Sequence, residues 1–194
     1  MNFLKNIYVW TLKKAEHKNA KWYLSLISFA ESSFFPIPPD ILLIPMALAS
    51  KTKALFYAFI CTLSSVLGGI FGYAIGYFFF NSVGLYIVEF YHLENSFNIF
   101  ENYYKEFGIL IVLGAGITPF PYKFITIASG VFGLNIYLFV IVSIIGRGLR
   151  FYLIAILLYF FGEKIKLFID KYFNILSITF FILLVGSVFI IRFL

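Results

Sequence analysis

Five ionisable side chains lie inside otherwise apolar stretches of this 194-residue chain: Glu31, Asp40, Lys123, Arg147 and Arg150. A charge at the depth of a lipid bilayer is costly unless it is paired or wet, so each of the five is a candidate functional residue. Arginine is suited to bidentate contact with phosphate. A carboxylate at such a depth can carry a proton or neutralise a cation. These residue types favour binding of an anionic group.

The settings of the five charges differ. Asp40 directly follows Pro38 and Pro39, and a carboxylate in the first turn of a helix is favoured by the helix dipole, which alone could account for it. Lys123 follows Pro121 in the same way, but there a cation opposes the dipole. A helix amino terminus beside a lysine is expected to bind an anion such as phosphate.

Arg147 and Arg150 are three residues apart and therefore share one face of a helix. The sequence allows two roles for these arginines and does not favour either. They could bind a phosphate group, or they could pair with Glu31 or Asp40 as a structural lock. Glu31 in turn could carry a proton or simply neutralise an arginine.

The composition sets the class of protein that holds these charges. Hydrophobic residues make up 62% of the chain and charged residues 12%, whereas soluble domains carry roughly a quarter charged residues. The high aromatic content excludes a disordered chain. The sequence thus predicts an integral membrane protein, and the net charge of +6 does not indicate a nucleic-acid partner.

No catalytic constellation is found. The two histidines, His17 and His92, are too far apart to suggest a metal site, and Cys61 is the only cysteine. We therefore expect a protein that is not an enzyme and that uses neither a cofactor nor a metal.

Three apolar runs, 54–80, 136–161 and 173–193, are long enough to cross a membrane. Two others, 22–50 and 108–134, are interrupted by proline, so that each half is too short to span. These runs hold all six prolines: Pro36, Pro38, Pro39 and Pro45 in the first, Pro119 and Pro121 in the second. The simplest interpretation is a pair of re-entrant helical hairpins that enclose a polar pocket.

The distribution of charge supports the first hairpin. Lysines occur in the segment before it and, as Lys51 and Lys53, directly after it. Since lysine marks the cytoplasmic side, both ends of the hairpin are expected there. Region 81–107 is acidic, as expected of the outer side. Its apolar stripe predicts an amphipathic helix over 85–107 at the outer interface.

The two hairpins also align with each other. Pro36-Ile37-Pro38 matches Pro119-Phe120-Pro121 at an offset of 83 residues, which places Asp40 opposite Lys123. One hairpin plus one crossing in each unit would invert the second copy, as in many transporters. Chance similarity between apolar segments is the alternative. A strip of small residues in the first long span predicts close helix packing: Ser64, Gly68, Gly72 and Gly76.

The predicted fold is an all-α polytopic membrane protein with two re-entrant hairpins in an inverted repeat, about three full transmembrane helices and one interfacial helix. Residues 1–21 would form a basic cytoplasmic segment and residues 22–162 the membrane domain. Residues 163–194 would form a connection and a C-terminal transmembrane helix.

The membrane domain resembles the DedA family, whose shared module is also called the VTT or SNARE-associated domain, and within it the YqaA-like subgroup. The resemblance rests on the segment from Phe29 to Asp40, the glycine strip with Tyr73, and Thr118-Pro119-Phe120-Pro121-Tyr122-Lys123 leading to Gly130. It implies paired re-entrant hairpins and translocation of undecaprenyl phosphate or phospholipid. The family's membrane carboxylates match Glu31 and Asp40, and its basic residue in the second hairpin matches Lys123. Many relatives carry an arginine shortly before the second proline, where this chain has Gly116-Ile117-Thr118.

The expected function is a lipid flippase or scramblase of the DedA type, with proton coupling left open. Lys123, Arg147 and Arg150 would bind an anionic headgroup. Glu31 and Asp40 would alternate between pairing with these cations and carrying protons. The expected location is the inner membrane, with the N-terminus in the cytoplasm. Membrane lipids are the expected partners, and whether the protein forms a homo-oligomer is left open. Two alternatives remain, namely a proton-coupled transporter of small solutes or ions, and a non-transporting membrane assembly protein.

Overall fold

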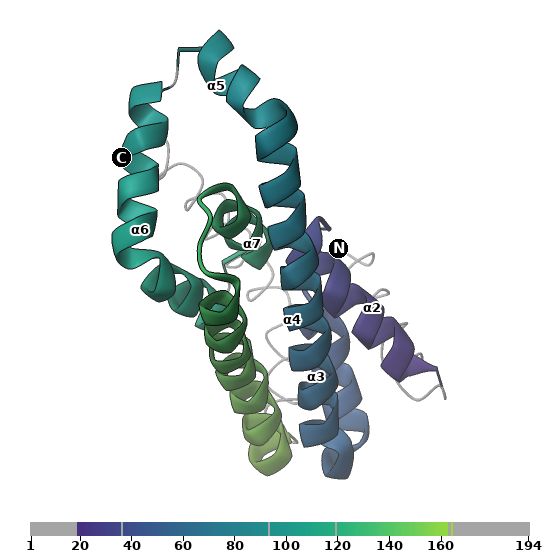
Figure 1. Ribbon diagram of the computed structural model, residues 1–194. Helices are drawn as coiled ribbons and strands as arrows, with labels where there is room; N and C mark the ends of the chain where they lie inside the picture. Colours follow the sequence, from purple (N-terminus) through teal and green to yellow (C-terminus); the bar gives the residue numbers. More distant parts are fainter. Residues whose placement is uncertain (1–18, 36, 93, 119, 163, 165–194) are drawn as a thin grey trace, which may run out of the picture.

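The computed structural model describes residues 19–35, 37–92, 94–118, 120–162 and 164. Within these residues all regular secondary structure is helical, which confirms the predicted all-α fold class (Figure 1). The four longer helices described before the second proline break are α2 (Ala20–Ser33), α3 (Asp40–Ala49), α4 (Ala54–Phe79) and α6 (Glu94–Ile117). After it come α7 (Tyr122–Val131) and Ile136–Gly162, which is the last helix among the described residues and is called the last helix below. Short connecting elements are η1 (Lys51–Lys53), η2 (Phe80–Gly84) and α5 (Leu85–Phe90).

Two of these helices are long and apolar enough to cross a membrane. They are Lys51–Phe79, in which η1 leads into α4, and Ile136–Gly162. Both coincide closely with the predicted spans 54–80 and 136–161. Their outward sides are apolar, and residues such as Phe59 and Ile144 are half exposed. The third predicted span, 173–193, and the segment 1–18 lie outside the described residues.

The chain leaves the helical conformation around both proline clusters. After α2 ends at Ser33, α3 begins at Asp40, and the carbonyl of Pro39 accepts hydrogen bonds from the amides of Leu42 at 3.0 Å and Leu43 at 2.9 Å. The φ of Pro39, −65°, already suits a helix start. The second break follows α6 and ends at Pro121, before α7. Pro36 and Pro119 lie outside the described residues.

The region between the two spans differs from the prediction. A boundary at 107/108, between an interfacial helix over 85–107 and the second hairpin, is wrong, because α6 runs unbroken from Glu94 to Ile117. The break falls earlier, after α5, where His92 adopts a φ of 53°. Gly108 lowers helix propensity but keeps its backbone N–H, so it does not end a helix as proline does.

Helices α2 and α7 both cross α4 on its face of small residues. Gly68 lies against the backbone of Phe29 in α2, and Gly76 lies against the backbone of Ile127 in α7. Between them, Gly72 faces Ser32 and Thr126. Ser64, one turn before Gly68, shares a hydrogen bond of 2.7 Å with Ser25 of α2. The small residues thus allow three backbones to meet directly, as small residues do in membrane helix bundles.

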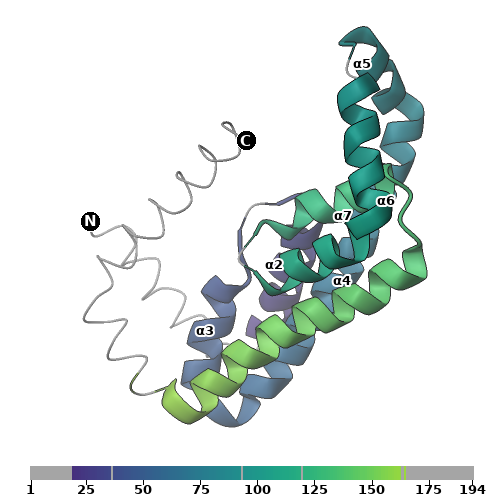
Figure 2. The ribbon, with the colours of Figure 1, turned by 90° about the vertical axis from the view of Figure 1, so that its left-hand side faces the viewer.

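The last helix also packs against α4, where Phe139 faces Gly69 and Gly148 faces Thr62. Near its middle and C-terminal end, Phe151 and Leu158 pack into a core cluster that also contains Leu24 of α2 and Leu43 of α3. Near its start, Phe139 joins a second cluster with Val112 of α6 and Tyr122 of α7. Figure 2 shows this helix lying along the bundle, beside α3 at one end and close to α7 at the other. It therefore contacts the elements on both sides of each proline break.

Candidate functional site

Arg147 and Glu31 form a buried ion pair between the last helix and α2. Arg147 is 1% exposed, and its Nη2 donates to Glu31 Oε2 at 2.5 Å. Its Nε donates to Ser65 Oγ of α4 at 2.6 Å, and Ser32 Oγ donates to the same Glu31 oxygen at 3.1 Å. The two charges therefore neutralise each other inside a set of serine hydroxyls.

Two aromatic rings also lie close to the Arg147 guanidinium. Its central carbon lies 4.8 Å from the ring centre of Tyr122 and 4.7 Å from that of Phe151. Such cation–π contacts strengthen when water is excluded. The hydroxyl of Tyr122 is held in turn by Ser143 Oγ at 2.6 Å. Arg147 thus contacts a carboxylate, serine hydroxyls and two aromatic rings.

Arg150 and Asp40 form a second ion pair, which is more open. Arg150 Nη2 donates to Asp40 Oδ2, and Nη1 donates to the carbonyl oxygen of Thr118. Asp40 starts α3 after the first break, and Thr118 follows α6 at the second, so one arginine joins both breaks to the last helix. The two side chains are 14% and 18% exposed, against 2% and 10% for Arg147 and Glu31.

The second pair is also incompletely satisfied. Asp40 Oδ1 and Arg150 Nε are buried, yet neither has a hydrogen-bond partner among the described residues. A buried polar atom without a partner costs free energy that a bound group could recover. The pair thus contains one acceptor and one donor without a partner among the described residues.

Lys123 lies in the first turn of α7, as predicted, and is partly buried. Its Nζ lies 5.3 Å from the ring centre of the adjacent Phe124. In the part of the chain that the structure describes, it forms no ion pair. The alignment of the two breaks placed it opposite Asp40, but Asp40 pairs with Arg150 instead. The structure contains the ion pairs that the sequence offered as an alternative to phosphate binding. Arg147 pairs with Glu31, and Arg150 pairs with Asp40.

Sequence reasoning missed a set of hydroxyl groups around this site. Ser28 donates to the carbonyl of Cys61 at 2.7 Å, Ser33 to that of Gly68 at 2.9 Å, and Thr126 to that of Ser32 at 2.9 Å. A signal was present, since Ser25, Ser28 and Ser32 recur at helical spacing within an apolar segment. These bonds connect α2 to α4 and to α7.

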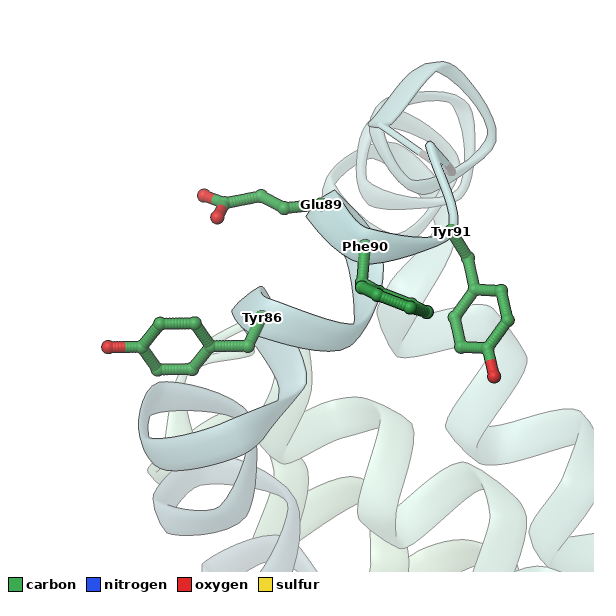
Figure 3. A pocket seen from close by; sticks show the side chains of 4 residues that line it. All are labelled: Tyr86, Glu89, Phe90 and Tyr91. Carbon is green, nitrogen blue, oxygen red and sulfur yellow. The ribbon is translucent and has the colours of Figure 1, made fainter.

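A surface hollow of about 580 Å³ lies away from these charges, at the end of α5. It is lined by Tyr86, Glu89, Phe90 and Tyr91, whose side chains point in different directions (Figure 3). Tyr86 and Phe90 are 71% and 79% exposed. Since no buried polar group converges there, the hollow lacks the features of a ligand site. Within the described ranges, no three His, Cys, Asp or Glu residues lie close enough to hold a metal ion.

Two bacterial proteins are similar to this chain over most of its length. A Haemophilus influenzae protein described as uncharacterized is 35% identical over 192 residues, covering 99% of this chain and all of the relative. A Histophilus somni protein, described as an uncharacterized homologue, is 32% identical over 164 residues, covering 84% and 85% of the two chains. No family model matches the sequence. No solved structure matches it either.

Proposed function

We propose that this protein is a membrane transporter or scramblase that moves a lipid with an anionic headgroup. The chain belongs to the same family as the two bacterial proteins, and both of those are described as uncharacterized. The proposal therefore rests on the site. The proposed location is the cytoplasmic membrane, with the N-terminus in the cytoplasm. The proposed mechanism is of the DedA type that the sequence resembles.

Placement in a membrane is supported by the two long apolar helices and their exposed apolar sides. The two breaks support re-entrant hairpins, since the half-helices α3 and α7 have 10 residues each and so extend only about 15 Å. In our proposal the two hairpins form the inverted repeat, and region 173–193 adds a third crossing.

The observation that carries the proposal is the contact of Arg150 with both breaks. Non-helical backbone at membrane depth needs polar partners, and here the carbonyl of Thr118 obtains one from an arginine that also holds Asp40. Polar groups from both breaks therefore meet on a helix whose other side is apolar. This arrangement suits a molecule with a charged head and apolar tails.

Lys123 is proposed as the first residue to bind the headgroup. It is partly buried at the amino terminus of α7, where the helix dipole and the lysine charge both favour an anion. Arg150 is proposed to bind the same headgroup next. Arg147 is buried in its ion pair with Glu31, and we propose that it acts at the site through that pair.

Replacing Lys123 with alanine is expected to slow lipid exchange by about tenfold or more, the effect of losing one charge-assisted hydrogen bond. The measurement is exchange of headgroup-labelled phospholipid in proteoliposomes of purified protein. Lys105→Ala is the matched control, because among the described residues Lys105 pairs with Glu101 on the surface of α6. Exchange at the wild-type rate in Lys123→Ala would contradict the proposed headgroup site. Uptake of small solutes without lipid exchange would favour the alternative transporter.

The proposed hairpin also predicts chemical labelling. Single cysteines replacing Lys14 and Lys51, in a Cys61→Ala background, should resist an impermeant thiol reagent in intact cells, because both are expected to be cytoplasmic. A cysteine replacing Asn95, which is exposed near the start of α6, should react. Opposite labelling of positions 14 and 51 would mean that the first broken stretch crosses the membrane.

A further inference from the structure

The two ion pairs have the same chemistry but different completeness. Arg147 donates through Nε to Ser65 and through Nη2 to Glu31, and two aromatic rings lie close to its guanidinium. Arg150 leaves its Nε without a partner among the described residues, and Asp40 leaves Oδ1 without one. The second pair is therefore the one in which a different anion could make better contacts.

The geometry of the guanidinium defines what that anion must be. Nε and Nη2 lie on one edge of arginine and together match two oxygens of a carboxylate or phosphate. Asp40 occupies only Nη2, through Oδ2. A phosphate group could accept hydrogen bonds from both nitrogens, because it is not attached to the protein backbone as the Asp40 carboxylate is.

We infer that the edge of Arg150 is a phosphate-binding site that Asp40 occupies as an internal competitor. A phosphate monoester or diester that takes Nε and Nη2 would displace the Asp40 carboxylate from Arg150. The inference rests on the proposed lipid transport, to which it adds a specific ligand group and a specific exchange. Nη1 can stay on the carbonyl of Thr118 throughout, so the second break keeps its partner.

The exchange has a structural consequence for α3. Asp40 is the first residue of this helix, and its bond to Arg150 ties the helix start to the last helix. When phosphate replaces the carboxylate, this tie is lost, while the pair of Glu31 and Arg147 still holds α2 in place. Phosphate binding therefore releases the start of α3 selectively.

The test measures binding rather than transport. Purified full-length protein in neutral detergent is titrated calorimetrically with dihexanoyl phosphatidic acid and, separately, with inorganic phosphate. Asp40→Asn removes the competing charge and should lower the Kd for the lipid by about tenfold or more, the effect expected when a charge-assisted hydrogen bond no longer competes. Glu101→Gln, which removes a partly exposed carboxylate on α6, should leave the Kd unchanged.

Arg150→Lys provides a second variant that keeps the positive charge beside Asp40. Lysine is a point charge without a planar fork, so the Kd for the lipid should rise about tenfold in a protein that still folds. An unchanged Kd in Asp40→Asn or in Arg150→Lys would overturn the inference. A change with inorganic phosphate alone would assign the site to free phosphate and overturn the lipid assignment.

The inference and the proposed function can fail separately. If both variants change lipid binding as expected but vesicles show no lipid exchange, the site stands and transport is refuted. If lipid exchange occurs and Asp40→Asn does not tighten binding, transport stands and the competition is refuted.

Discussion

Replacing Arg147 with methionine should lower the free energy of unfolding by about 3–5 kcal/mol, because Glu31 would remain as an unpaired carboxylate in a packed interior. The loss of the cation–π contacts with Tyr122 and Phe151 adds to this effect. Thermal and denaturant unfolding of the purified protein in detergent would measure it.

The double variant Glu31→Gln with Arg147→Met should recover much of this loss, since neither charge is then buried alone. Lys105→Met is the matched control. It breaks the exposed pair with Glu101 on α6 and should cost no more than about 0.5 kcal/mol. A small loss in the Arg147→Met variant would mean that Glu31 finds another partner or becomes protonated without cost.

Replacing Gly130 with leucine should destabilise the protein by about 3 kcal/mol or more, or prevent its assembly. A Cβ at this position of α7 would lie 2.7 Å from the backbone nitrogen of Tyr77 in α4, and backbone cannot move aside as a flexible side chain can. The yield of folded protein in size-exclusion chromatography and its unfolding midpoint would report the effect.

Gly114→Leu is a sharp control for that variant. Gly114 is also a helical glycine, in α6, but a Cβ there would meet no atom within 4 Å. Leucine has the higher helix propensity, so this change should leave stability equal or raise it by up to about 1 kcal/mol. Equal losses for the two variants would show that the crossing of α4 and α7 is not tightly packed in the protein.

The sequence predicted those parts of the fold that depend on local chemistry. Apolar runs of sufficient length gave the helices Ala54–Phe79 and Ile136–Gly162, and the proline pairs gave the starts of α3 and α7. The boundary at 107/108 could not be found in this way. Glycine permits a helix to continue or to end, and only packing against neighbouring elements decides between the two.

The candidate site was predictable as a set of residues but not as a set of contacts. Buried charges stand out in an apolar sequence, so Glu31, Asp40, Arg147 and Arg150 could be selected. Which of them meet depends on how each helix is rotated about its axis, and the sequence does not fix that angle. The alignment of the breaks therefore placed Lys123 opposite Asp40, whereas the packing of the last helix brought Arg150 there.

The direct backbone contacts along α4 also restrict how this molecule could change shape. Phe29 of α2 and Ile127 of α7 touch glycines of α4, and Thr126 bonds to Ser32 between the two crossing helices. Three helices in such contact cannot slide past one another without backbone overlap, so α2, α4 and α7 should move as one rigid body. Any alternation between inward and outward states would then be carried by α3 and α6, because Arg147 ties the last helix to this body through Glu31 of α2 and Ser65 of α4.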